Sequence, residues 1–189
     1  MTTETSDAPK LPISHPDLPF RLHVCGKNQV KKAAKRIGAT HVITLLDPMD
    51  RLFLPPSIDP RNHFRLSFDD EEKSTKLYAP TPSHVETILA YGRNIPTDAI
   101  VIVHCHAGQC RSTAAALAIL VQSLGTDRVD EAVALLVANR PEAVPNRLMA
   151  FYADRLLGTG SKLLDASKAL RDARYMPGGT ANPVFEPPM

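Results

Sequence analysis

The stretch VIVHCHAGQCRSTAAALAIL, residues 101–120, passes from an apolar run into a segment rich in alanine and leucine. The run AIVIV (99–103) is typical of a buried strand, and residues 111–124 have the composition of a helix that ends before Gly125. Between them lies HCHAGQC (104–110), which holds two histidines and two cysteines. Three interpretations arise for this connection: a metal site, a redox pair, or a nucleophile in an anion-binding loop.

Strand-like and helix-like segments alternate on both sides of this stretch. Apolar and β-branched segments predict strands over 20–25, 40–46 and 99–103, and the alternation of apolar and polar residues predicts another over 63–68. Helical periodicity with capping residues predicts helices over 27–38, 81–95, 111–124 and 127–138, and one more after Pro145. We therefore expect an α/β fold with a central, mainly parallel sheet of about four to five strands flanked by helices. In such folds ligands bind beyond the carboxyl ends of the strands, where the connection 104–110 lies.

The two ends of the chain differ in composition from the middle. Residues 1–19 are polar and rich in proline, which predicts an extended arm. Residues 20–158 form the predicted domain. Residues 159–189 hold an amphipathic stretch and a tail rich in proline and glycine, which we expect to be a peripheral helix and a mobile end.

The overall composition excludes several classes of protein. Hydrophobic residues make up 43% of the chain and charged residues 22%, as in ordinary soluble domains. The net charge of +2 is too small to favour nucleic acid or membrane as a partner, and no apolar run approaches the roughly 18 residues of a membrane span. The N-terminus lacks the features of a secretory signal. Three cysteines argue against a disulfide scaffold, so we expect a cytoplasmic protein.

The connection between strand and helix has the features of an anion-binding loop. Because it is short, it must curl so that backbone N–H groups point inward, and these donors and the helix N-terminus favour an anion of phosphate size. Gly108 allows an unusual backbone conformation, and Arg111 can hold two oxygens of the anion. The same field favours the thiolate of Cys105, a nucleophile that Ser112 or Thr113 could assist by a hydrogen bond. The predicted phosphate-binding residues are His106, Ala107, Gly108, Gln109, Cys110 and Arg111.

The segment HCHAGQCRST (104–113) resembles the signature of cysteine-based protein tyrosine phosphatases: His-Cys, five residues, Arg, and Ser or Thr, with glycine in the middle. The similarity to compact dual-specificity phosphatases covers about 20–158, through KRIGATHVITLLD and NRPEAVPNRLMAFYADRLL. It implies hydrolysis of phosphotyrosine, and of phosphoserine or phosphothreonine, through a cysteinyl-phosphate intermediate and without a cofactor or metal. The expected substrate is a phosphorylated protein or a small phosphomonoester, bound in a shallow cleft. His104 and Asn146 would have structural roles.

The leaving oxygen in such a reaction needs a proton from a general acid. In the family this residue lies just after the strand that FRLSFDD resembles, and the spacing points to Asp70, with Asp69 as the nearest alternative. Asp59 and Asp47 are further candidates. Glu71 and Glu72 are interpreted as part of a solvated acidic turn.

Several alternatives stay open at this point. A metal site would need a second Cys/His pair, which is not evident downstream, and Arg111 would repel a cation. A phosphate-binding module without turnover is a second hypothesis, and a thiol redox enzyme of the arsenate reductase type is a third. A redox enzyme of this type needs a further, resolving cysteine. Cys25 is the only remaining cysteine, and we interpret it as a buried residue that packs in a strand. Cys105 and Cys110 have the spacing of the pair that forms a protective disulfide in low-molecular-weight tyrosine phosphatases, so Cys110 is predicted to make the enzyme redox-sensitive, unless it only fills a tolerant position.

Overall fold

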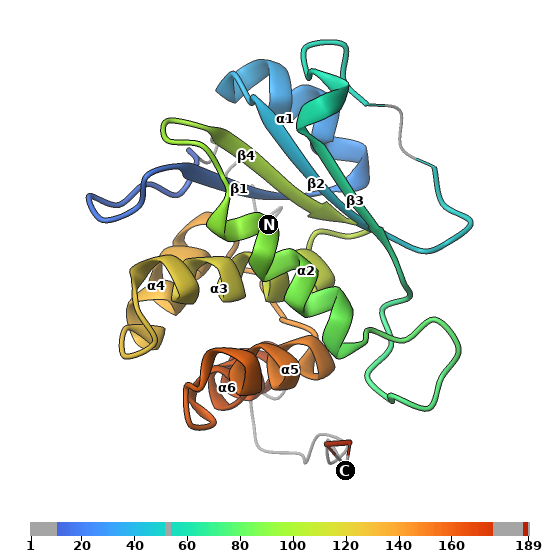
Figure 1. The fold of residues 1–189 in the computed structure, drawn as a ribbon, viewed down its shortest axis with the longest axis vertical. Coiled ribbons are helices and arrows are strands. Elements are labelled where there is room, and N and C mark those ends of the chain that lie inside the picture. Colours follow the sequence, from blue (N-terminus) through green and yellow to red (C-terminus); the bar gives the residue numbers. More distant parts are fainter. Residues whose placement is uncertain (1–10, 52–53, 176–186, 189) are drawn as a thin grey trace, which may run out of the picture.

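The computed structural model describes residues 11–51, 54–175 and 187–188. Four parallel strands form one sheet in the order β1-β4-β2-β3 (Figure 1). The strands are β1 (Arg21–Gly26), β2 (His41–Leu46), β3 (His63–Ser67) and β4 (Ile100–Cys105). The helices are α1 (Val30–Ile37), α2 (Pro82–Arg93), α3 (Arg111–Leu124), α4 (Val129–Asn139), α5 (Arg147–Leu157) and α6 (Lys162–Tyr175), with short 3-10 turns at Lys27–Gln29 and Pro60–Asn62. The predicted α/β fold with a parallel sheet is confirmed.

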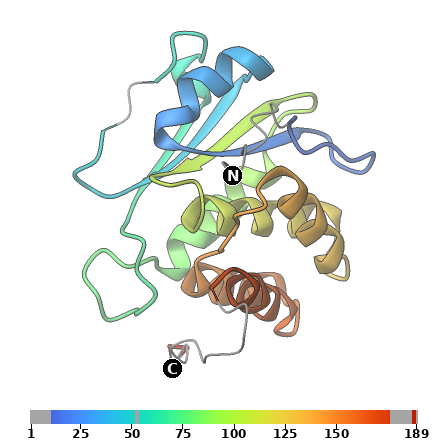
Figure 2. The ribbon, with the colours of Figure 1, turned by 180° about the vertical axis from the view of Figure 1, so that it is seen from behind.

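Helix α1 covers one face of the sheet, and the other helices lie on the opposite face (Figures 1 and 2). Strand β4 is central, since it pairs with β1 on one side and with β2 on the other, and all six of its residues are buried. The strands are parallel, so their carboxyl ends meet at one edge of the sheet. That edge is where β4 ends at Cys105 and the predicted phosphate loop begins.

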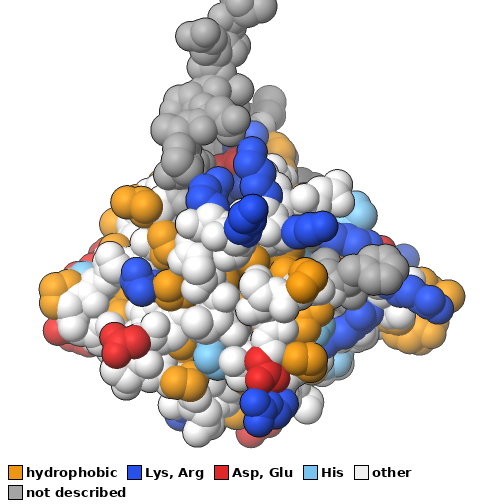
Figure 3. All heavy atoms as spheres, turned by 90° about the horizontal axis from the view of Figure 1, so that it is seen from above, with side chains coloured by type: hydrophobic (Ala, Val, Ile, Leu, Met, Phe, Trp, Pro, Cys, Tyr) orange, Lys and Arg blue, Asp and Glu red, His pale blue; other side chains and the backbone are white. Residues whose placement is uncertain are grey.

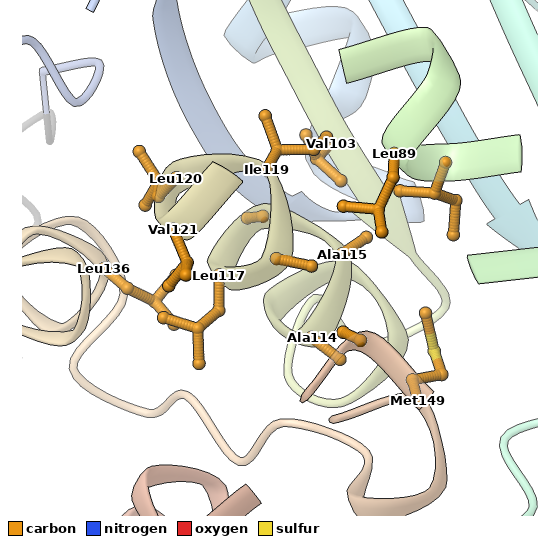
Figure 4. Packing of buried hydrophobic residues seen from close by; sticks show 14 of the residues in the cluster. Leu89, Val103, Ala114, Ala115, Leu117, Ile119, Leu120, Val121, Leu136 and Met149 are labelled. Atoms are coloured by element: carbon orange, nitrogen blue, oxygen red, sulfur yellow. The ribbon is translucent and has the colours of Figure 1, made fainter. Parts of the chain in front are cut away.

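The core on the helical face is built around α3. Of its residues only Gln122 and Ser123 are not buried, because α2, α4 and α5 surround it and the sheet lies above it (Figure 4). Alanine at 114, 115, 116 and 118 lets these neighbours approach closely, while Leu117 and Leu120 fill the remaining space. The helix that follows the phosphate loop is therefore held rigidly from all sides.

The opposite face of the sheet has a smaller core and a charged exterior. Val30, Ala33 and Ala34 of α1 pack on Val42 and Ile102. The other side of α1 exposes the cations Lys31, Lys32, Lys35 and Arg36, and basic side chains outnumber acidic ones on the face seen in Figure 3. A net charge of +2 thus conceals an uneven distribution of charge over the surface.

Residues on both sides of the predicted 20–158 span contribute to the core. Before it, Ile13 and Leu18 are buried, and Ile13 forms an antiparallel bridge with Leu22 of β1. After it, Leu163 and Leu164 of α6 are buried where this helix packs against α5 and α4. The amphipathic stretch at 161–175 is therefore an integral part of the packed structure and not a peripheral helix. None of the helices within the described ranges is long and apolar enough to cross a membrane.

Candidate active site

The loop between β4 and α3 is pinned to the neighbouring strand by Gly108. This residue has a φ of +75°, and a Cβ built on it would lie 2.4 Å from the carbonyl carbon of Cys25. Any other side chain would therefore be strained by its backbone conformation and would also collide with the backbone of β1. Glycine is therefore required at position 108 on both counts, as its place in the loop sequence predicts.

The backbone carbonyls of the loop are all bonded to groups outside it. Three carbonyls accept from backbone N–H groups: His106 from Lys27 (3.0 Å), Gln109 from Val144 (2.9 Å) and Cys110 from Asn146 (3.2 Å). The other two accept from the side chain of Arg140: Ala107 from Nη2 (3.0 Å) and Gly108 from Nε (2.9 Å). A peptide unit that sends its C=O outward directs the N–H of the next residue the opposite way. The loop therefore presents a row of N–H donors to its interior, which is the arrangement that binds an oxyanion.

Cys105 lies at the floor of this loop. Its side chain is buried, and its Sγ is 3.2 Å from the Ser112 Oγ and accepts a hydrogen bond of 3.2 Å from the Gly108 N–H. Donors directed at sulfur stabilise negative charge on it. Of the two hydroxyls considered from the sequence, Ser112 contacts the sulfur, whereas Thr113 donates to the backbone carbonyls of Gln109 and Cys110.

Arg111 begins α3 and is almost fully buried, with 2% of its surface exposed. Its Nη1 donates to the Asp47 carboxylate at 2.5 Å and to the Phe68 carbonyl at 2.6 Å. Its buried Nε has no hydrogen-bond partner among the described residues. A buried donor without a partner is costly, so a bound oxyanion that accepts from Nε would remove this penalty. The guanidinium is thus held through Nη1, and its Nε can donate to a ligand.

His104 supports the loop from below. It is fully buried, its Nε2 is 2.8 Å from the Thr44 hydroxyl, and its Nδ1 is 3.4 Å from the Cys105 carbonyl. Burial lowers the pKa of His104 to about 4, so its ring is neutral at physiological pH. A neutral ring bonded on both sides fits the structural role that the family resemblance implied.

The rim of the loop is polar and more exposed. His106 and Ala107 are exposed, and Gln109 and Cys110 are half-buried. The His106 Nδ1 is 3.4 Å from one oxygen of Asp50, whose other oxygen accepts from Lys27 at 2.7 Å. The hydrogen bond from Lys27 is the main cause of the lowered pKa of Asp50. Within the described ranges, no three His, Cys, Asp or Glu side chains come together as a metal site would require.

Asp70 lies beside the start of α3 and α5. Its Oδ1 accepts a hydrogen bond of 2.8 Å from Asn146 Nδ2, and its carboxylate also bonds the Cys110 thiol. The Asn146 Oδ1 accepts from Met149 N at 3.0 Å, so this residue caps α5 and holds Asp70 at the same time. Asp69, by contrast, is fixed through its backbone, since its N–H donates to the Tyr78 carbonyl at 2.7 Å.

The other two candidates for the general acid, Asp59 and Asp47, each bond an arginine. Asp59 caps the 3-10 turn Pro60–Asn62, and hydrogen bonds from Arg61 lower its pKa to about 2, which makes it a poor proton donor. Asp47 forms the ion pair with Arg111. These contacts leave Asp70, which bonds Cys110 of the loop, and its neighbour Asp69 as the candidates for the general acid.

The interpretation of Glu72 as a solvated acidic residue is wrong. Only 20% of its side chain is exposed, and its two oxygens bond Arg147 and Arg171. These partners are 75 and 99 residues away along the chain, so no local pattern could have revealed them. The ion pair between Arg111 and Asp47 was missed for the same reason.

The side chain of the third cysteine lies on the other face of the sheet from Cys105. Cys25 packs with α1 on one face of the sheet, whereas Cys105 belongs to the core on the other face. Burial raises the pKa of Cys25 to about 12. These observations fit the packing role proposed for it and do not suit a resolving thiol.

No family model and no curated protein matches the chain. Solved structures do. The Yvh1 phosphatase domain from Chaetomium thermophilum is similar with a TM-score of 0.56 and 18% identity, over 81% of this chain and 97% of that one. DUSP15 has a TM-score of 0.54 and 18% identity, over 84% and 94%. Human DUSP28 has a TM-score of 0.52 and 19% identity, over 84% and 96%. The chain therefore has the fold of these dual-specificity phosphatases.

Proposed function

We propose that this protein is a protein phosphatase that hydrolyses phosphotyrosine, and also phosphoserine or phosphothreonine, through a cysteinyl-phosphate intermediate. One observation carries the proposal: the Cys105 sulfur lies at the floor of a loop whose carbonyls are all bonded outward, beside a buried arginine with an unpaired donor. Nucleophile, anion-binding donors and cation thus converge where the phosphoryl group would lie.

In the first step the phosphate dianion binds the inward N–H groups of the loop and the Nε of Arg111, which has no partner among the described residues. The Cys105 thiolate forms a bond to phosphorus while the bond to the leaving oxygen breaks, and Asp70 gives its proton to that oxygen. The products are cysteinyl phosphate and the free alcohol or phenol.

In the second step water attacks the phosphorus of the cysteinyl phosphate. The Asp70 carboxylate takes up a proton from this water, and the thiolate leaves with a hydrogen bond from Ser112. Inorganic phosphate is released, and both side chains return to their starting states. Neither step requires a metal or a cofactor.

The substrate class follows from the charge of the loop. Apart from Arg111 it contains no Lys or Arg, so a phosphoprotein or a small phosphomonoester is favoured over an inositol lipid with several phosphates. The enzyme is proposed to act in the cytoplasm, where three unpaired cysteines stay reduced.

The cheapest test compares wild type with Cys105→Ser on para-nitrophenyl phosphate and a phosphotyrosine peptide. The variant should lose roughly 10⁴-fold or more in turnover. It should still bind inorganic phosphate, because the backbone donors and Arg111 remain. Cys25→Ala is the matched control, since it removes a thiol outside the site and should retain turnover.

The alternatives give different results in this assay. A silent phosphate-binding module would bind phosphate in both forms without turnover by either. A thiol redox enzyme would fail to hydrolyse aryl phosphates and would instead reduce arsenate in the presence of a thiol. Turnover that survives in Cys105→Ser would show that the nucleophile is another residue.

A further inference from the structure

The acidic turn that carries Asp70 is joined to the last two helices by one carboxylate. Glu72 Oε2 accepts from Arg147 Nε at 2.8 Å and lies 2.7 Å from Arg147 Nη2. Glu72 Oε1 accepts from the Arg147 backbone N–H at 2.9 Å and from Arg171 Nη2 at 2.6 Å. A single side chain thus connects the turn to the first residue of α5 and to α6.

The same region holds Asp70 directly. Asn146, the residue before Arg147, donates from Nδ2 to Asp70 at 2.8 Å and to the Glu71 carbonyl at 3.1 Å. Three consecutive residues of the turn are therefore fixed by two consecutive residues at the start of α5. Helix α6 is tied to this place by a second contact, because Ser167 donates to the Pro145 carbonyl at 2.8 Å.

These contacts are of a kind that determines position. The side chains of Arg147, Arg171 and Glu72 are only 11%, 18% and 20% exposed, and the bonds between them are charge-assisted. By contrast, residues 73–78, which follow in the same segment, are all exposed. Burial therefore does little to hold the middle of this segment, and near Asp70 it is attached by the contacts of Asn146 and Glu72.

We propose that Glu72, Arg147 and Arg171 form a clamp that keeps Asp70 in place for proton transfer, so that helix α6 acts on the protonation step of catalysis. This inference rests on the role of Asp70 in the proposed function. Glu72 and Arg171 are positioning residues, since they bond the turn and not the reacting atoms. A general acid displaced by a fraction of an ångström transfers its proton less effectively.

The clamp is tested by the dependence of kcat on the leaving group. Phenyl phosphate needs a proton donor, whereas para-nitrophenyl phosphate, with its better leaving group, needs it less. Arg171→Ala should lower kcat for phenyl phosphate by about tenfold and for para-nitrophenyl phosphate by less than about twofold. KM should change little for either substrate, and the basic limb of the pH profile should become shallower.

Two further variants separate positioning from general stability. Arg171→Lys keeps a cation within reach of Glu72 and should restore most of the lost kcat. Arg174→Ala removes an exposed arginine from the same helix and should behave as wild type on both substrates. Glu72→Gln, which keeps the shape of the side chain, should reproduce the selective loss of Arg171→Ala. Thermal unfolding of each variant checks that the fold is retained.

Failure of the clamp can be told apart from failure of the proposed function. The clamp would be overturned if Asp70→Asn shows a selective loss of kcat for phenyl phosphate but Arg171→Ala does not. The Arg171→Ala variant would then either lose kcat equally on both substrates or, although folded, lose none. If Asp70→Asn shows no selective loss, the assignment of the acid is wrong. In an Asp70→Asn background, Arg171→Ala should add no further dependence on the leaving group, because the group that it positions is already inactive.

Discussion

The two segments that meet at the active site are held in place by different kinds of contact. The phosphate loop is fixed through backbone atoms: Gly108 lies against β1, and the loop carbonyls each accept a hydrogen bond from outside. The turn that carries Asp70 is fixed mainly through side chains, those of Asn146, Arg147 and Arg171. The groups that would bind phosphate therefore lie within one short motif, whereas the position of Asp70 depends on side chains of α6 and of the start of α5.

This difference has a consequence for mutations in the two segments. Changes in the phosphate loop should impair the reaction with every substrate, because all substrates share the phosphoryl group. Changes around Asp70 should impair the reaction most for substrates with a poor leaving group, which depends on protonation by the general acid. The predictions for Arg111 and Asp70 test this distinction, and those for His104 and Cys110 test the support and the protection of the phosphate loop.

The largest effect is expected for Arg111→Lys. An ammonium keeps the charge, but it cannot hold Asp47 and the Phe68 carbonyl while also donating to two phosphate oxygens. We expect kcat/KM to fall by about 10³-fold or more for both phenyl and para-nitrophenyl phosphate. Arg61→Lys, which alters a surface pair with Asp59, is the control. Near-normal rates in Arg111→Lys would contradict the anion-binding role of the loop.

Asp70→Asn should lower kcat by about 10²–10⁴ for phenyl phosphate and by much less for para-nitrophenyl phosphate. The basic limb of its pH profile should flatten, since the proton that ionises there has been removed. Steady-state kinetics over a range of pH gives both results. Asp69→Asn is the matched variant, and a larger selective loss there would move the acid one residue earlier in the chain.

A smaller effect concerns stability and isolates the support beneath the phosphate loop. Burial lowers the pKa of His104 to about 4 in the folded protein, whereas an unfolded histidine has a pKa near 6.5. As pH falls below about 6.5 the unfolded state takes up a proton first, so the native state loses stability until about pH 4. The titration of His104 should therefore lower the free energy of unfolding by about 2 kcal/mol when the pH falls from 7 to 5.

The measurement is chemical denaturation of wild type and His104→Gln at both pH values. Glutamine can still bond Thr44 but does not titrate, so the variant should lose less stability than wild type over this range. The other titrating groups are common to both proteins and cancel in the difference. An equal loss in the two proteins would show that His104 is not held neutral.

The smallest effect is expected for Cys110. This residue should affect how well Cys105 is protected from irreversible oxidation, and not the rate of turnover. Peroxide should convert the Cys105 thiolate to a sulfenic acid, and the Cys110 thiol should condense with it to give a disulfide and water. Burial raises the pKa of Cys110, so this step should be slow. After mild peroxide and dithiothreitol, wild type should recover more activity than Cys110→Ser, and peptide mapping should find the disulfide. Equal recovery would make Cys110 a bystander.

The sequence predicted those features that are encoded by neighbouring residues. The strand at 99–103, the helix from Arg111 and the proposed roles of Cys105, Gly108 and Ser112 all follow from one local motif, and the structure brings these residues together. The strands at 40–46 and 99–103 were found from their apolar runs, and the strand at 63–68 from its alternation of apolar and polar residues.

Contacts between distant charged residues were not predictable in this way. Asp47 lies 64 residues from Arg111, and a charged side chain considered alone is more often solvated than paired. Glu72 was misinterpreted for this reason. The burial of Ile13 was also missed, because a few apolar residues in a polar segment carry no periodic signal. Leu163 lies in a stretch whose amphipathic pattern was recognised, but that pattern does not tell which elements its apolar side packs against.

The central claim is that Cys105 carries the phosphoryl group during turnover, and trapping that intermediate tests it most directly. Ser112→Ala should slow its breakdown, because the sulfur then leaves without its hydrogen bond. Rapid denaturation of this variant during turnover of a ³²P-labelled phosphotyrosine peptide should leave label on the peptide that contains Cys105, and none in Cys105→Ser. Undiminished turnover with no label on Cys105, or label on another residue, would contradict the account.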